Sequence, residues 1–158
     1  MRTWKPAIAV VVFAISAAGA VHAQTPAPTP NTVDLANRRM FVDPSSTSVS
    51  LGKARLTVSP LSHKEGTYAG DYQLKVVPYF FKSQKGPLVL VTSDDLISKL
   101  SQGLPVEFTG KATNSTDGTF KVVKGKATPS SDDKGVVAFS IPTDNGEMVF
   151  NTNYHFGK

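Results

Sequence analysis

Apolar and polar residues alternate through the last third of the chain, and this pattern predicts strands. The alternation has a period of two, which is typical of strands that bury one face and expose the other. Clusters that place Asp or Asn close to Gly separate the alternating segments, and such clusters allow the backbone to reverse sharply. The predicted strands cover residues 104–113, 119–128, 136–142 and 147–156. Together they predict an antiparallel meander.

The same alternation assigns one face of each meander strand to the core. The expected inward side chains are Val106, Phe108, Ala112, Phe120, Val122, Val137, Phe139, Ile141, Met148, Phe150, Thr152, Tyr154 and Phe156. Burial of one such apolar side chain contributes roughly 1.5–3 kcal/mol. About a dozen of them suffice to oppose the chain entropy of one small domain.

Two alternating segments precede the meander, at residues 51–59 and 71–77. Their expected inward side chains are Ala54, Leu56, Val58, Tyr72, Leu74 and Val76. Between and after them we expect a loop or a ragged hairpin connection at residues 61–70, a turn at 83–87 and a short strand at 88–91. Pro78 has no amide hydrogen, so the strand before it must bend, bulge or lie at an edge.

One helix is expected near residues 94–102. Ser93 suits the N-cap position, acidic residues follow it in the first turn, and a glycine after the helix suits the C-terminal stop. Its apolar stripe would pack across an open end or a face of the sheet. The predicted fold class is therefore mainly β, either a small antiparallel β-barrel or a β-sandwich. It would have about seven strands and one short α-helix.

The segment before these strands differs in composition. Residues 7–21 form an unbroken apolar run that follows two positive charges and precedes small residues, which predicts a signal peptide over residues 1–23. The run is shorter than the roughly 20 apolar residues that span a bilayer, so we expect no membrane span in the mature chain. Residues 24–50 are rich in Pro and Ser and predict a weakly structured linker before a β domain at 51–158. We expect export to the periplasm or the cell exterior.

Charge and cysteine content narrow the chemistry. The chain has no cysteine, which excludes disulfides, thiolate metal sites and cysteine nucleophiles. The formal net charge is +5. Loss of Arg2 and Lys5 with the leader reduces 17 basic residues to 15 against 12 acidic ones, a net charge of about +3. Such a mild charge is compatible with an anionic partner without requiring one.

Reactive groups are sparse in the predicted mature chain. His63 and His155 are its histidines, and no serine occupies a Gly-x-Ser-x-Gly turn, so no hydrolase triad is expected. Two isolated histidines do not predict a zinc site. Asp132, Asp133 and Asp144 are the best calcium candidates, but the spacing of a calcium-binding loop is absent. The sequence therefore predicts no catalytic residues, no metal and no cofactor.

Consecutive aromatic residues and a repeated motif suggest ligand-binding surfaces. A strand cannot bury the three rings at 79–81 on one face, so they either join the core through a bulge or partly face solvent beside lysines. The sequence GKAT occurs at 110–113 and at 125–128, which predicts either two similar strand ends or a duplicated edge that presents lysines. The candidate ligand-binding residues are Tyr79, Phe81, Lys82, Lys85, Lys111 and Lys126.

These observations lead us to expect a secreted, non-enzymatic binding or structural module of the bacterial cell envelope. Its partner would be a polysaccharide, an envelope protein or another copy of the chain, rather than a nucleic acid. One alternative is a weak binder of polyanions, either nucleic acid or acidic polysaccharide, through a sheet face that bears lysines. The lysines of this alternative are Lys82, Lys85, Lys111, Lys121, Lys124 and Lys126. Another alternative is a small hydrolase with an acid–base pair around His155.

Overall fold

One antiparallel sheet makes up most of the structure, a computed structural model that describes residues 34–50, 52–143 and 146–158. Its strands are β1 (Arg39–Val42), β2 (Ser45–Val49), β3 (Gly52–Val58), β4 (Ser62–Lys64), β5 (Thr67–Val77), β6 (Gln84–Val91), β7 (Val106–Thr113), β8 (Phe120–Ser131), β9 (Lys134–Thr143) and β10 (Gly146–Gly157). One α-helix, α1 (Asp94–Ser101), and two short 3-10 helices, η1 (Leu35–Asn37) and η2 (Phe80–Lys82), complete the described elements.

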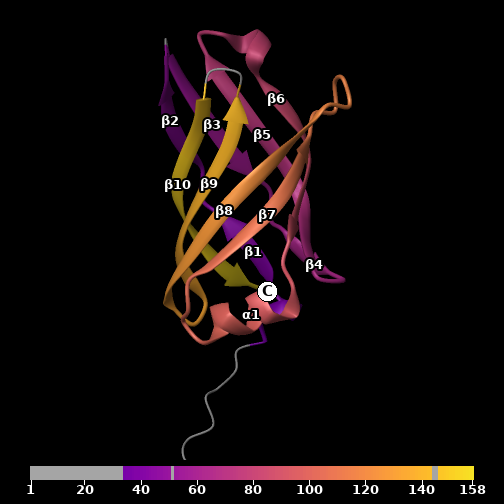
Figure 1. Ribbon diagram of the computed structural model, residues 1–158, viewed down its shortest axis with the longest axis vertical. Coiled ribbons are helices and arrows are strands. Elements are labelled where there is room, and N and C mark those ends of the chain that lie inside the picture. The colour runs from indigo at the N-terminus through magenta and orange to yellow at the C-terminus, as the bar shows by residue number, and fades with distance from the viewer. Residues whose placement is uncertain (1–33, 51, 144–145) are drawn as a thin grey trace, which may run out of the picture.

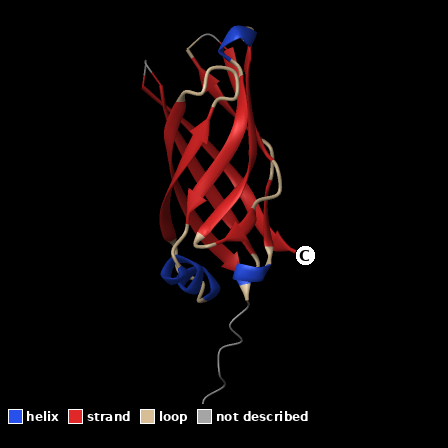
Figure 2. Ribbon diagram, turned by 90° about the vertical axis from the view of Figure 1, so that its right-hand side faces the viewer, coloured by secondary structure: helices blue, strands red, loops and turns tan. Residues whose placement is uncertain are grey.

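The sheet curls into a half-barrel, which Figure 1 and Figure 2 show in two views a quarter turn apart. Its strand order is β1-β10-β9-β8-β7-β6-β5-β3-β2, and β4 pairs with β5 outside this path. The predicted fold class, mainly β and antiparallel with one short helix, is confirmed. The sheet has 10 strands, more than the approximate number expected, because several connecting segments also pair.

The C-terminal meander forms as predicted, with β7, β8, β9 and β10 as successive neighbours. Most of its expected inward side chains belong to one core cluster inside the curl. The buried ones are Val106, Phe108, Ala112, Val137, Phe139, Ile141, Phe150, Tyr154 and Phe156. Met148 and Thr152 are half-buried on the same face.

The inward assignment is wrong on β8. Phe120 and Val122 are 57% and 47% exposed, whereas Val123 is 2% exposed. In the observed register Gly125 lies opposite the buried Phe108, which places the odd-numbered residues of this strand inside. Two consecutive valines made both registers compatible with alternation. The small inward residues further along gave no apolar signal to decide between them.

The sheet begins inside the segment that the sequence assigns to a linker, at Arg39 rather than near residue 51. β1 pairs with β10 and β2 pairs with β3, so one stretch of chain reaches both ends of the curled sheet. At this junction, which we call the seam, Ser45 Oγ donates to the Asn151 carbonyl at 2.8 Å. The Thr152 hydroxyl donates to the carbonyl of Asp43, also at 2.8 Å. Apolar alternation could not reveal the polar strand β2, and β1 is short, although its Met40 and Val42 are buried in the core.

Two connecting segments also contribute strands, and the first, expected as a loop or a ragged hairpin connection, forms a hairpin of β4 with β5. The loop at 61–70 contains β4 and the start of β5, and the turn at 83–87 overlaps the start of β6. His63 of β4 lies opposite Tyr68 of β5, whose buried hydroxyl donates to the Leu35 carbonyl at 2.8 Å. The buried ring of Tyr68 thus holds together a segment whose polar sequence resembles a loop.

The glycines of the two GKAT segments lie beneath large side chains. Gly110 is the registered neighbour of Leu90, and Gly125 is the registered neighbour of Phe108. A Cβ atom on Gly110 would lie 2.6 Å from Leu90 Cδ2, and one on Gly125 would lie 2.1 Å from Phe108 Cζ. Both glycines therefore make room for a core side chain. The lysine after each glycine is exposed on the outer face.

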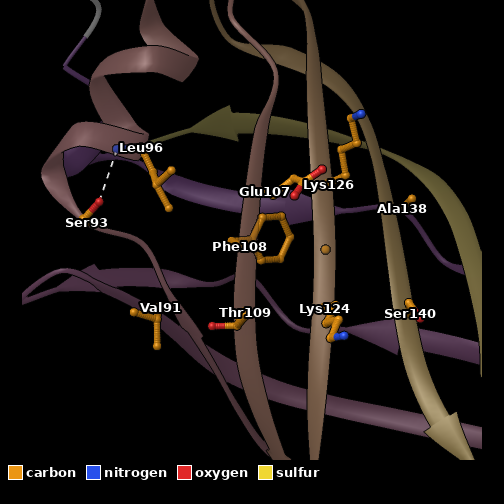
Figure 3. A pocket seen from close by; sticks show the side chains of 11 residues that line it. Val91, Ser93, Leu96, Glu107, Phe108, Thr109, Lys124, Lys126, Ala138 and Ser140 are labelled. Atoms are coloured by element: carbon orange, nitrogen blue, oxygen red, sulfur yellow. Dashed lines mark hydrogen bonds between the residues drawn. The ribbon is translucent and has the colours of Figure 1, made fainter.

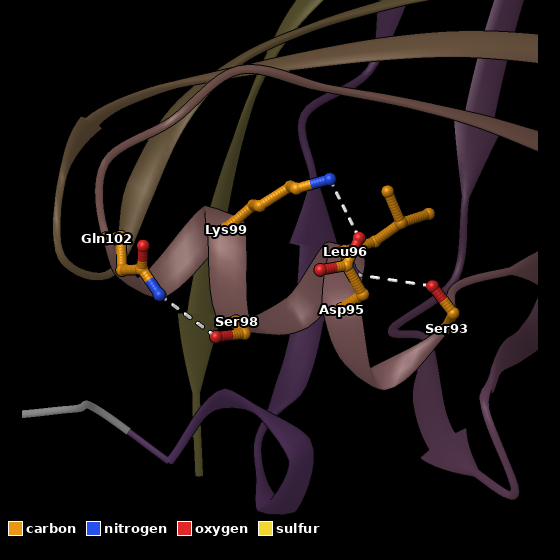
Figure 4. A network of polar contacts seen from close by, with 6 residues as sticks. All are labelled: Ser93, Asp95, Leu96, Ser98, Lys99 and Gln102. Carbon is orange, nitrogen blue, oxygen red and sulfur yellow. Dashed lines mark hydrogen bonds and ion pairs between the residues drawn. The ribbon is translucent and has the colours of Figure 1, made fainter.

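The predicted helix is confirmed as α1, which packs at one end of the curled sheet (Figure 1). The Ser93 hydroxyl accepts the Leu96 amide hydrogen at 3.4 Å, and Lys99 Nζ lies 2.7 Å from Asp95 Oδ2 (Figure 4). The two buried side chains of the helix join the core. None of the helices in the described part of the chain has the length and apolar character needed to cross a membrane.

Candidate functional site

A groove of about 520 Å³ lies over the outer side of β7, β8 and β9, next to the start of α1 (Figure 3). Most of its lining residues belong to two rows that run across the strands, and within each row the residues on adjacent strands lie opposite one another. The first row contains Val91, Thr109, Lys124 and Ser140. The second row contains Glu107, Lys126 and Ala138. Leu96 of α1 closes the side that faces β6.

The groove exists because β9 carries small side chains on its outer face. Ala138 and Ser140 alternate with the buried Val137 and Phe139, so they point outward. The outward residues of the neighbouring β8 in the same rows are lysines with long side chains. The small side chains of β9 therefore form the floor of the groove, and the lysines of β8 form a basic wall beside it.

A second hollow of about 480 Å³ continues the first across β9 to β10. Lys126 and Ala138 line both hollows, so the two are contiguous. The far side adds the amide side chains of Asn151 and Asn153. We call the two hollows together the outer-face groove. Its residues offer ammonium, hydroxyl and amide groups, and the carboxylate of Glu107, along one continuous strip of the sheet.

Lys124 and Lys126 supply the positive charge of the groove, and both are exposed. Glu107 is the registered neighbour of Lys126. Nevertheless, the one ion pair within residues 34–50, 52–143 and 146–158 joins Lys99 to Asp95 on α1. The ammonium groups of the groove are therefore available for charge-assisted hydrogen bonds with an anionic ligand.

The hydroxyl of Ser140 is an unused polar group at the groove floor. Its oxygen is buried and has no hydrogen-bond partner in the described structure. A buried polar group without a partner costs about 1–3 kcal/mol.

A separate surface lies at the end of the sheet opposite α1, where β5 connects to β6 (Figure 1). Tyr79 packs partly against the core, whereas Phe80 and Phe81 of η2 are 68% and 81% exposed. Lys82 Nζ lies 5.9 Å from the centroid of the Tyr79 ring. We call residues 79–82 the aromatic tip. It unites three of the candidate ligand-binding residues: Tyr79, Phe81 and Lys82.

The other three candidate ligand-binding residues lie on the sheet itself. Lys85 belongs to β6 just after the aromatic tip, and its carbonyl accepts the Ser115 amide hydrogen at 2.9 Å. Lys111 of β7 places its Nζ 4.1 Å from the centroid of the exposed Phe120 ring. Lys126 lines the outer-face groove. The six residues thus belong to at least two surfaces and do not form one site.

Sequence reasoning missed the floor and far side of the groove, formed by Ala138, Ser140, Asn151 and Asn153. Period-two alternation does identify them as outward residues. Their importance depends on which strands lie beside β9, and alternation within one strand carries no information about its neighbours.

His63 and His155 each lie against an aromatic ring, but only His155 is stacked on it. His155 is exposed, and its ring lies parallel to that of Phe41 with centroids 4.9 Å apart. The ring centroid of His63 lies 5.0 Å from that of Tyr68. The geometry at His155 is that of an exposed stacked ring rather than a histidine hydrogen-bonded to a carboxylate.

The described calcium candidates, Asp132 and Asp133, are not part of an arrangement that could hold a metal ion. Asp132 and Asp133 lie in the turn between β8 and β9, while Asp144 lies outside the described residues. Within the described ranges, no group of three or more His, Cys, Asp or Glu side chains is arranged to hold a metal ion.

Comparison with known protein families, curated protein sequences and solved structures gives no match to this chain.

Proposed function

We propose that this protein is an exported, non-enzymatic binding module of the bacterial cell envelope that holds an acidic polysaccharide in its outer-face groove. The observation that carries the proposal is the position of Lys124 and Lys126 along a hollow whose floor is made by Ala138 and Ser140. Two ammonium groups without an ion-pair partner in the described chain lie beside two contiguous hollows of about 520 and 480 Å³. Export is inferred from the predicted signal peptide at residues 1–23.

The lining of the groove favours a polysaccharide over a single-stranded nucleic acid. Proteins that bind single strands without sequence preference stack successive bases on exposed aromatic rings. The one aromatic residue that lines the groove is Phe108, and it is buried. Hydroxyl and amide groups such as those of Thr109 and Asn151 match the hydroxyl groups of sugars. Lysines match their carboxylate or sulfate groups.

The proposal is tested by binding to polygalacturonate, with neutral dextran as the comparison polymer. We expect binding to polygalacturonate that weakens steeply as salt is added, because lysine contacts to a polyanion release counterions. The double variant Lys124→Gln with Lys126→Gln is expected to lower affinity at least about tenfold.

A matched control removes the same charge elsewhere on the sheet. Arg55 of β3 and Lys75 of β5 are exposed registered neighbours that do not line the groove. The double variant Arg55→Gln with Lys75→Gln is expected to stay within about threefold of the parent affinity. Equal losses in the two double variants would show that net charge alone drives binding. Equal affinity for dextran and polygalacturonate would refute an anion site.

A further inference from the structure

The aromatic tip exposes two large apolar rings that the proposed function does not use. Phe81 and Phe80 have the largest exposed fractions of the large apolar residues in the described structure, at 81% and 68%. The preceding Val77 is also exposed. Exposed apolar groups that cluster in this way mark interaction sites more often than single exposed residues do.

Hydrogen bonds fix the tip in one conformation. The Lys82 amide donates to the Tyr79 carbonyl at 2.9 Å, and the Ser83 amide donates to the Phe80 carbonyl at 3.0 Å. The Ser83 hydroxyl accepts the Val76 amide hydrogen at 3.0 Å, which ties the turn to the end of β5. The turn that carries the rings is therefore already ordered, and binding costs little conformational entropy in the backbone.

Most of the charged residues near the aromatic tip are basic. The sequence from residue 72 to residue 93 contains Lys75, Lys82 and Lys85 and no acidic residue. The neighbouring strands β2 and β3 add Lys53 and Arg55, again without an acidic residue. Acidic residues lie instead mainly in the turns and helix at the α1 end, at Glu65, Asp94, Asp95, Asp132 and Asp133. Asp117 lies in the turn between β7 and β8, which contacts Lys85 through the Ser115 amide, and Glu147 lies at the start of β10.

We propose that the aromatic tip docks on the surface of a bilayer that contains anionic lipids. Phe80 and Phe81 would enter the boundary between headgroups and acyl chains, where exposed rings lose contact with water. Lys82 and Lys85 would remain among the phosphates, since lysine side chains can extend toward charged headgroups while their stems pack on apolar groups. A projecting turn can insert into the deformable surface of a bilayer. A folded protein partner would instead need a pocket of matching shape. This inference is independent of the outer-face groove.

The test measures partition of the exported, purified protein onto vesicles of phosphatidylcholine with about 30% phosphatidylglycerol, at about 0.15 M salt. Cleavage of the expected leader removes Trp4, the one tryptophan of the chain. The variant Phe81→Trp then reports the tip alone. We expect its emission to shift to the blue and to become protected from aqueous iodide when anionic vesicles are added.

Serine variants measure the contribution of the rings. Phe81→Ser is expected to lower the partition coefficient at least about tenfold, since burial of one such ring is worth more than a factor of ten. Leu104→Ser changes a residue that is 48% exposed, between α1 and β7, and should leave partition unchanged. No side chain of η2 is buried, so these variants are expected to keep the fold, which thermal unfolding would verify.

Three results would overturn the proposal. They are absence of binding to the anionic vesicles, equal binding by Phe81→Ser and the parent, and iodide access to the introduced indole in the presence of vesicles. Capture of a soluble protein that depends on Phe81 without vesicle binding would also overturn it, because the tip would then be a protein-docking site.

Discussion

The ring of Phe108 covers the backbone of Gly125, its registered neighbour on β8, so closely that a Cβ atom there would lie 2.1 Å from the ring. The same ring meets Phe139 edge-on, with centroids 5.8 Å apart. This contact places a core aromatic directly beneath the strand that carries Lys124 and Lys126. The packing of Phe108 in the core therefore requires a residue without a Cβ atom at position 125.

Gly125→Ala is expected to lower the free energy of unfolding by about 1–3 kcal/mol, because the packed ring cannot move aside without strain. The smaller entropic gain of alanine over glycine would not offset this loss. Urea unfolding measures the change. Combination with Phe108→Leu should recover part of it, and a double-mutant cycle should give a coupling of about 1 kcal/mol. Additive effects would show that the ring and the glycine do not interact as described.

The seam supplies a second prediction. Ser45 is 9% exposed and donates to the Asn151 carbonyl, so Ser45→Ala leaves that acceptor without its partner. We expect a loss of about 1 kcal/mol in unfolding free energy. Ser46→Ala, one residue along the same strand and exposed, should change it by less than about 0.5 kcal/mol. Indistinguishable values for the two variants would argue against a structural role for the seam.

Alkaline pH should destabilise the fold. Burial raises the pKa of Tyr154 from 10.0 to about 12. Burial, and to a lesser degree the Asp34 charge, also raises the pKa of Tyr68. A phenol with a raised folded-state pKa stabilises the fold fully below its unfolded pKa. This contribution decreases as pH rises from 10 toward 12, because the unfolded state releases its proton first.

Chemical denaturation at a series of pH values measures this effect. Stability should fall above pH 10, and each such tyrosine contributes at most about 1.4 kcal/mol per pH unit. Tyr154→Phe removes one titrating group, so the decline should be shallower in that variant. Identical slopes in the parent and the variant would mean that Tyr154 does not titrate differently on folding.

A change of shape without a change of charge tests the groove in another way. Ala138→Leu fills the floor that the two hollows share. It is expected to weaken polygalacturonate binding about tenfold or more while leaving stability nearly unchanged, since the position is on the outer face. Ala69→Leu makes the same substitution at an exposed site on β5 and should leave affinity unaltered. Full binding by Ala138→Leu would exclude the groove floor from the site.

Much of the fold could be predicted from the alternation of apolar and polar residues. Ala54, Leu56 and Val58 mark the inner face of β3, and the capped stripe near Ser93 marks α1. The sequence does not predict β2 because its residues are mostly polar, and it does not predict β1 because that strand has four residues, of which Met40 and Val42 are buried. The register of β8 was misassigned because consecutive valines permit either face.

The candidate site could be predicted only in part. Lys126 and the residues around Phe81 stood out by composition, but their division between a groove and a tip follows from strand order and from the turn after Pro78. Ala138 and Ser140 define the groove by being small. A small outward residue matters only when its neighbours on adjacent strands are known to be large.

The most direct test of the central claim, that the outer-face groove is the ligand-binding site, is a backbone NMR titration with an oligogalacturonate. We predict that the largest shift changes map to β8, β9 and the facing part of β10, around Lys124, Lys126, Ala138, Ser140 and Asn151. Shift changes confined to the aromatic tip, spread evenly over all basic residues, or absent at saturating ligand would contradict the account.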